Sequence, residues 1–126
     1  PLEQVEPVMC REELLTAIAK VRQVHVDDQI YDYIARLAEV TRTHPLLKLG
    51  ISPRGALALC RTAKARAFAE GRDFVVPEDV TQMAEYVFAH RLMLSSKARL
   101  NEYTPEAIVA EVLAQTQPPV LSERRA

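Results

Sequence analysis

Residues 49–71 read LGISPRGALALCRTAKARAFAEG, and this stretch decides the fold. Ser52 suits the N-cap of a helix because its hydroxyl accepts a backbone N–H, and Pro53 suits the first helical position, where no N–H is needed. The many alanines that follow have small side chains, which allow neighbours to approach on several sides. The stretch therefore predicts a long and central helix from Pro53 to about Gly71.

Periodic apolar residues on either side predict further helices. A helix over about residues 11–22 presents one apolar face. The next helix begins at Asp27-Asp28 and ends near His44, because Pro45 disfavours helix at the residue before it. Its apolar residues recur at a 3.6-residue period: Ile30, Ile34, Leu37, Ala38 and Thr41.

The second half of the chain repeats the proline-marked helix start. Residues 74–76 form a short extended stretch, and Pro77 then begins a fourth helix. Pro105 begins a fifth, which runs to about Ala114. The sequence thus predicts an all-α fold, a small helical bundle of four to five helices.

The composition sets limits on the class of protein. With 126 residues, 48% of them hydrophobic, the chain has the size and apolar content of one folded domain. A formal net charge of −1 provides no basic excess for wholesale binding of nucleic acid or acidic membranes. No apolar run approaches the ~18 residues of a membrane span, and no signal peptide is recognisable. We expect a cytoplasmic protein whose two cysteines are reduced.

Motifs for a self-contained active site are missing from the sequence. It contains no G-x-x-x-x-G-K-[ST], no G-x-G-x-x-G and no H-E-x-x-H. Its histidines, His25, His44 and His90, lack a zinc-ligand spacing, and neither cysteine neighbours a histidine. We therefore expect no metal site, and we do not expect this chain alone to be catalytic.

One helix start differs from the others in its charge. Four of the five predicted helices place an acidic residue in the first turn, where it interacts favourably with the helix dipole. The helix at Pro53 has Arg54 there instead. Either Arg54 turns to solvent or to a distant acid, or an external anion such as phosphate completes the site. Arg61, two turns further along, would extend a basic stripe on the same face.

An ordered set of motifs resembles a known family. The set comprises Thr41-Arg42-Thr43-His44-Pro45, Leu49-Gly50-Ile51-Ser52-Pro53-Arg54, Gly71-Arg72-Asp73-Phe74, Pro77-Glu78-Asp79-Val80 and His90-Arg91. Over about residues 8–116 the chain closely resembles the C-terminal lid domain of MoxR-type AAA+ ATPases. That resemblance divides the chain into a linker from an absent ATPase core over residues 1–10, a helical lid domain over 11–116, and a flexible tail over 117–126.

The resemblance also implies roles for particular residues. Arg54 matches the sensor-2 arginine, which contacts the phosphates of ATP, and Ser52 and Pro53 share its motif at the nucleotide. ATP with Mg²⁺ would be bound mainly by the missing core. Arg42 and Arg91 match family positions, and we interpret them as structural or inter-subunit contacts. The family further implies a hexameric ring of identical subunits, chaperone-like maturation of other proteins, and partners with von Willebrand factor A domains.

Two alternatives remain open from the residues alone. The chain could be a stand-alone helical module for protein interaction, without nucleotide binding. It could also bind nucleic acid through a basic cluster: Arg54, Arg61, Lys64, Arg66 and Arg72. The net charge of −1 and the scarcity of aromatic residues beside this cluster argue against the nucleic-acid hypothesis.

Overall fold

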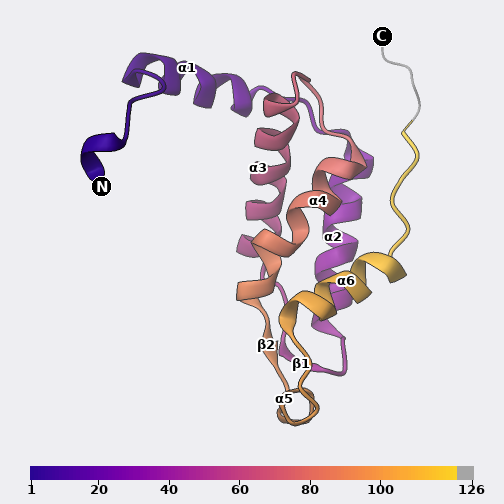
Figure 1. Ribbon diagram of the computed structural model, residues 1–126. Coiled ribbons are helices and arrows are strands. Elements are labelled where there is room, and N and C mark those ends of the chain that lie inside the picture. The colour runs from indigo at the N-terminus through magenta and orange to yellow at the C-terminus, as the bar shows by residue number, and fades with distance from the viewer. Residues whose placement is uncertain (122–126) are drawn as a thin grey trace.

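The computed structural model describes residues 1–121 of the chain, and within them six α-helices account for most of the structure. Helix α3 packs beside α2 and α4, and α6 lies across α4 and α2 (Figure 1). The helices are α1 (Arg11–Arg22), α2 (Asp28–Arg42), α3 (Pro53–Ala69), α4 (Pro77–Phe88), α5 (Ser96–Leu100) and α6 (Pro105–Gln115). Two short 3-10 helices, Leu2–Gln4 and Ala89–Arg91, complete the helical structure of this region. The all-α prediction is confirmed, and α5 is a short addition to it.

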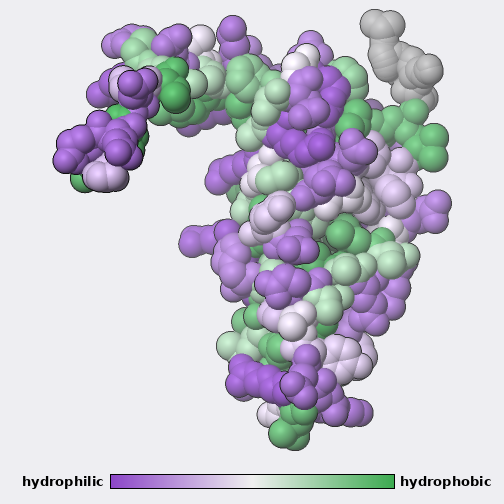
Figure 2. All heavy atoms as spheres, viewed as in Figure 1, coloured by the Kyte–Doolittle hydropathy of each residue, from purple (hydrophilic) through white to green (hydrophobic). Residues whose placement is uncertain are grey.

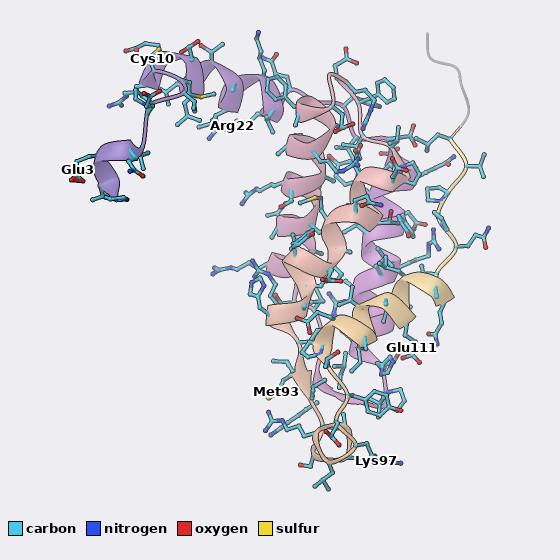
Figure 3. The ribbon with its side chains drawn as sticks, in the orientation of Figure 1. Glu3, Cys10, Arg22, Met93, Lys97 and Glu111 are labelled. Carbon is cyan, nitrogen blue, oxygen red and sulfur yellow. The ribbon has the colours of Figure 1, made fainter. Side chains whose placement is uncertain are left out.

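A small antiparallel sheet lies at the end of the bundle where α3 begins. It joins β1 (Leu47–Leu49) to β2 (Met93–Leu94), and α5 follows directly after β2. Figure 3 shows Met93 and Lys97 at this narrow end, far from the N-terminal segment. The pairing connects the loop before α3 to the loop after α4, so the two loops support each other.

The core forms from the faces that the sequence predicts. All five periodic residues of α2 are buried: Ile30, Ile34, Leu37, Ala38 and Thr41. α3 packs against α4, α2 and α1, which confirms its central place. Its buried positions include Leu59, Cys60 and Ala63. Burial raises the pKa of the Cys60 thiol, against the opposing charges of Lys64 and Arg61, so this cysteine is a neutral core residue.

A buried carboxylate joins the end of α3 to the start of α4. Asp79 is 0% exposed and accepts hydrogen bonds from Arg66 and Arg72 and from the backbone N–H of Val76, all at 2.7 or 2.8 Å. Burial alone would raise the pKa of Asp79, but these hydrogen bonds outweigh it and lower the pKa below its ordinary value. The bond from Val76 also satisfies a backbone donor at a helix start whose N-cap side chain has no polar atom.

A second polar contact ties α6 to the loop after α2. His44 accepts the backbone N–H of Leu46 on Nδ1 at 3.1 Å, and its Nε2 lies 2.6 Å from a carboxylate oxygen of Glu111. Because Nδ1 accepts, Nε2 carries the proton and donates to Glu111. Figure 3 labels Glu111 on α6, near the β1–β2 end of the bundle. This histidine has a structural role.

The N-terminal segment stands away from the bundle (Figures 1 and 2). α1 has the bounds that the sequence predicts but contains no buried residue. Its apolar face is half exposed, with Leu14 at 49%, Leu15 at 50% and Ile18 at 40%. α1 contacts α3, and at the end of α1 Lys64 donates to the carbonyl oxygen of Arg22 at 2.8 Å.

The tail predicted over residues 117–126 is described only in part. Residues 117–121 form no helix or strand but contact the bundle. Arg36 donates to the carbonyl oxygen of Gln117 at 3.2 Å, and Leu121 packs against the core. Residues 122–126 lie outside the described residues.

Candidate functional site

The start of α3 has the local structure that its sequence predicts. The Ser52 hydroxyl accepts the backbone N–H of Gly55 at 3.2 Å, and Pro53 occupies the first turn. The first turn contains no acidic residue. Arg54 is exposed, and no residue in the described range 1–121 forms a hydrogen bond or ion pair with its guanidinium. Its charge is therefore available to an external anion.

The end of α2 fixes the residue that precedes this start. The Thr41 hydroxyl accepts the backbone N–H of Ile51 at 2.8 Å, and Nε of Arg42 donates to the carbonyl oxygen of Ile51 at 2.8 Å. Both polar backbone atoms of Ile51 are thus held by neighbouring residues of one helix. Through its Nε, Arg42 therefore helps to hold the loop before α3.

Gly50 allows the loop to approach α2 closely. A Cβ atom at this position would lie 2.6 Å from the backbone carbon and oxygen of Thr41 and 2.7 Å from the backbone nitrogen of Arg42. Backbone atoms cannot move aside as the end of a flexible side chain does. Position 50 therefore requires glycine for space, and the hydrogen bonds of Ile51 depend on that space.

Arg91 lies across the first turn of α3. Its Nε donates to the carbonyl oxygen of Val87 at 3.0 Å. Gly55 is buried, and a Cβ atom there would lie 3.3 Å from Cδ of Arg91 and 2.9 Å from Cγ2 of Ile51. The glycine at position 55 thus gives Arg91 room to lie over the helix start.

A groove of about 580 Å³ opens beside the start of α3, and we call it the basic groove. It is lined by Arg42, Lys48, Leu49, Gly50, Ile51, Ser52 and Arg91. Three of these side chains are cationic and none is acidic. Sequence reasoning singled out Arg42 and Arg91 but not Lys48, which lies in β1 and is brought to the groove by the β1–β2 pairing.

The basic cluster of the nucleic-acid hypothesis is divided by the fold. Arg66 and Arg72 are paired with Asp79, and Lys64 donates to Arg22. Within residues 1–121, only Arg54 and Arg61 of that cluster have no such partner. Two of the five cations in the predicted cluster are therefore neutralised by a carboxylate.

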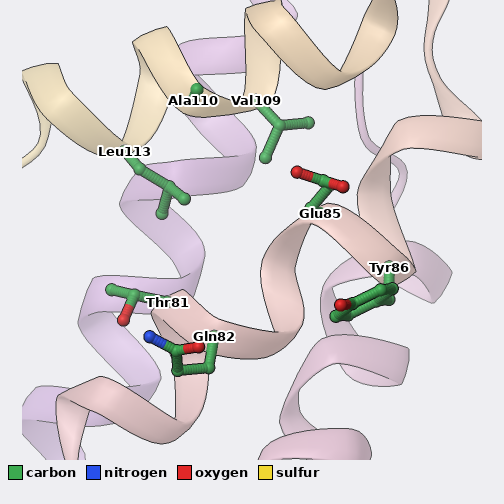
Figure 4. Close-up of a pocket in the computed structure, with 7 residues that line it drawn as sticks. All are labelled: Thr81, Gln82, Glu85, Tyr86, Val109, Ala110 and Leu113. Carbon is green, nitrogen blue, oxygen red and sulfur yellow. The ribbon is translucent and has the colours of Figure 1, made fainter.

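A second hollow, of about 230 Å³, lies between α4 and α6 (Figure 4). Its lining residues include Glu85 and Tyr86 of α4 and Val109 of α6, and none of them is cationic. Among residues 1–121, no group of three histidine, cysteine or acidic residues could hold a metal ion. No helix in this same range is both long and apolar enough to cross a lipid bilayer.

A family model described as AAA lid domain matches residues 39–112, well over half of the chain. The chain belongs to the AAA lid domain family. The matched region begins in α2 and ends in α6, so it includes the start of α3 and the whole basic groove.

Two relatives match the chain over most of its length. "Uncharacterized protein YeaC" of Bacillus subtilis is 38% identical over 120 residues, covering 95% of this chain and 38% of that protein. "Chaperone MoxR1" of Mycobacterium tuberculosis is 29% identical over 119 residues, covering 87% of this chain and 32% of that protein. The chain therefore spans between 32% and 38% of the length of these relatives, and it resembles the MoxR type that the motifs indicate.

A solved structure shares the fold over almost the whole chain. The crystal structure of "a putative ATPase from Cytophaga hutchinsonii" superposes with a TM-score of 0.86 at 26% sequence identity. The match covers 93% of this chain and 38% of that one.

Proposed function

We propose that this chain is the lid, or sensor-2, domain of a MoxR-type AAA+ ATPase. The lid closes over ATP that is bound, with Mg²⁺, mainly by a core outside this chain. It couples ATP hydrolysis to chaperone-like maturation of partner proteins. Family membership and the greater length of the relatives support this proposal. The observation that carries it is Arg54, which lies in the first turn of a long helix and has no partner for its guanidinium among residues 1–121.

The chemistry of this helix start fits a phosphate group. Free N–H groups and the helix dipole favour an anion, and a guanidinium adds a planar fork of donors. Phosphoryl transfer depends mainly on positioning and on neutralising charge, so Arg54 needs no proton to give or take. Arg54 would contact the γ-phosphate, and loss of that contact after hydrolysis would free the lid to rotate.

The proposal extends to the surroundings of the domain. Residues 1–10 form a linker from the core, and residues 11–116 form the lid. The whole protein assembles as a cytoplasmic homo-hexamer in which the lid contacts neighbouring subunits. Proteins with von Willebrand factor A domains are among its partners.

The decisive experiment uses the protein encoded by the gene region around this chain. We expect the region upstream of Pro1 to encode a G-x-x-x-x-G-K-[ST] motif and a Walker B acid. In that protein, Arg54→Ala should lower kcat for ATP hydrolysis by about 10³-fold, as for other arginines that contact a transferring phosphate. Arg61→Ala is the matched control, because Arg61 is an exposed arginine of the same helix. Unchanged turnover and nucleotide affinity for Arg54→Ala would refute the assignment.

The half-exposed apolar face of α1 favours a second candidate function, a stand-alone module for protein interaction. A start codon directly before Pro1 would support this alternative, because no ATPase core would then be present in the same chain. Arg54→Ala would in that case leave partner binding unchanged.

A further inference from the structure

The basic groove gathers positive charge from three separate elements. Arg42 ends α2, Lys48 lies in β1, and Arg91 ends the 3-10 helix after α4. Ser52, the N-cap of α3, lies on the same groove, so the positive end of the helix dipole adds to these charges. Elements far apart in the sequence thus converge on one concave, cationic surface.

The two arginines of the groove are held by one nitrogen each. Nε of Arg42 donates to Ile51 and Nε of Arg91 donates to Val87, at 2.8 and 3.0 Å. No residue of the described part of the chain accepts a hydrogen bond from their terminal Nη atoms. These anchors restrict the side chains in advance, so a ligand that uses the free Nη donors loses less entropy on binding.

The charge of the groove is uncompensated. Within residues 1–121, three other arginines are paired with carboxylates: Arg36 with Asp32, and Arg66 and Arg72 with Asp79. No carboxylate of that region lies within 4.0 Å of the cationic atoms of Arg42, Lys48 or Arg91. Like charges gathered in a hollow repel one another and focus a positive potential, which favours an anion.

We infer that the basic groove binds a phosphate group of a nucleotide, beside the phosphate contact of Arg54. The inference rests on the proposed function for the identity of the ligand. Three cations match a polyphosphate better than a single carboxylate, because a polyphosphate brings several negative charges and more acceptor oxygens. Arg42, Lys48 and Arg91 would then be binding residues in addition to Arg54.

The test uses the 126-residue chain, whose core lies entirely within the bundle, with inorganic tripolyphosphate as the probe. We expect the backbone amide resonances of residues 48–54 and 91 to shift on titration at low salt. Lys48→Gln should raise the Kd about two- to fivefold through the loss of one exposed cation. Lys97→Gln is the matched control, because Lys97 is an exposed lysine outside the groove. Arg91→Gln should weaken binding as well.

The outcomes separate this inference from the proposed function. If Lys48→Gln and Arg91→Gln leave the Kd unchanged while Arg54→Gln raises it, the groove is not a phosphate site, although the proposed role of Arg54 stands. If the groove variants raise the Kd and Arg54→Gln does not, the groove inference stands and the role of Arg54 falls. Equally tight binding of a penta-glutamate peptide, with shifts at the same residues, would overturn phosphate as the ligand.

Discussion

The hydroxyl of Thr41 joins two elements: it donates to the carbonyl oxygen of Ala38 in α2 at 2.6 Å and accepts the backbone N–H of Ile51 at 2.8 Å. Thr41 is 1% exposed, so water does not compete for these hydrogen bonds. The consequence is that the loop before Ser52 has one fixed position relative to α2. The position of Arg54 follows from that of the loop.

Thr41→Val tests this attachment, because valine keeps the shape and removes the oxygen. The Ile51 N–H then loses its acceptor, and we expect the free energy of unfolding to fall by about 1–3 kcal/mol. Urea denaturation measures the change. Thr43→Val is the control, because Thr43 is exposed and its hydroxyl lies 3.5 Å from the nearest acceptor. Equal losses for the two variants would contradict the attachment.

Gly50 and Gly71 are required for different physical reasons. Replacing each of them with asparagine distinguishes the two reasons. Gly71 has φ +83° and nothing within 4 Å of an added Cβ, whereas Gly50 lacks space against the backbone of Thr41. Asparagine tolerates a positive φ, so Gly71→Asn should cost about 1 kcal/mol or less. Gly50→Asn should cost more, about 1–3 kcal/mol, as overpacking does. Thermal unfolding of both variants measures which of them loses more stability. A larger loss for Gly71→Asn than for Gly50→Asn would contradict the steric argument.

Asp79 predicts a dependence of stability on pH. Its pKa is lower in the folded protein than the ordinary value of 3.8. Its stabilising contribution is therefore complete above about pH 4, and it is lost as the pH falls through the folded pKa. Asp79→Asn should lower the free energy of unfolding at pH 7 by about 3 kcal/mol, because Arg66 and Arg72 lose their shared partner. The free energy of unfolding of this variant should also fall less steeply than that of the wild type below pH 4.

Glu78→Gln provides the comparison for Asp79, because Glu78 is exposed and lies 4.0 Å from Arg66. An exposed pair of this kind contributes about 1 kcal/mol or less. Denaturation curves from pH 2 to pH 7 measure the free energy of unfolding of the wild type, Asp79→Asn and Glu78→Gln. Parallel acid profiles for the wild type and Asp79→Asn would show that Asp79 does not control this range.

The buried hydroxyl of Tyr33 predicts a stabilising substitution. Tyr33 is 0% exposed, and its hydroxyl has no hydrogen-bond partner among the described residues. Burial raises the pKa of this phenol, while the charge of Arg36 opposes the shift, so the group is neutral at pH 7. Tyr33→Phe removes an unpaired polar atom and should raise the free energy of unfolding by about 1 kcal/mol. A loss of stability on urea denaturation would show that the hydroxyl is paired.

The sequence predicts the helices well because their starts and faces are local properties. Ser52-Pro53 and Thr104-Pro105 begin helices as expected, and the buried face of α2 matches its period residue by residue. The short elements α5 and β2 cannot be predicted in this way. α5 has five residues and β2 has two, too few to show a period. Their existence depends on the pairing of β2 with β1, a contact between distant parts of the chain.

The candidate site is predicted in its residues but not in its geometry. Arg54 is identifiable from the missing acid in its helix turn, and Arg42 and Arg91 from the resemblance. Lys48 and Gly50 are not, because the groove and the close approach to Thr41 arise only on folding. Thr41 gives a weak signal, a hydroxyl on an otherwise apolar face. Likewise, the helical spacing of apolar residues over 11–22 shows that α1 has an apolar face, but it does not show which surface covers that face.

α1 meets α3 near the C-terminal end of that helix, where Lys64 donates to Arg22, whereas Arg54 belongs to the first turn of α3 (Figure 1). A helix of 17 residues is roughly 25 Å long. In a closing lid, α3 would act as a lever: a tilt of about 10° around the end beside α1 would displace Arg54 by about 4 Å over that length. Hydrogen bonds to phosphate extend over about 3 Å, so a small rotation at the end beside α1 would suffice to make or break the contact.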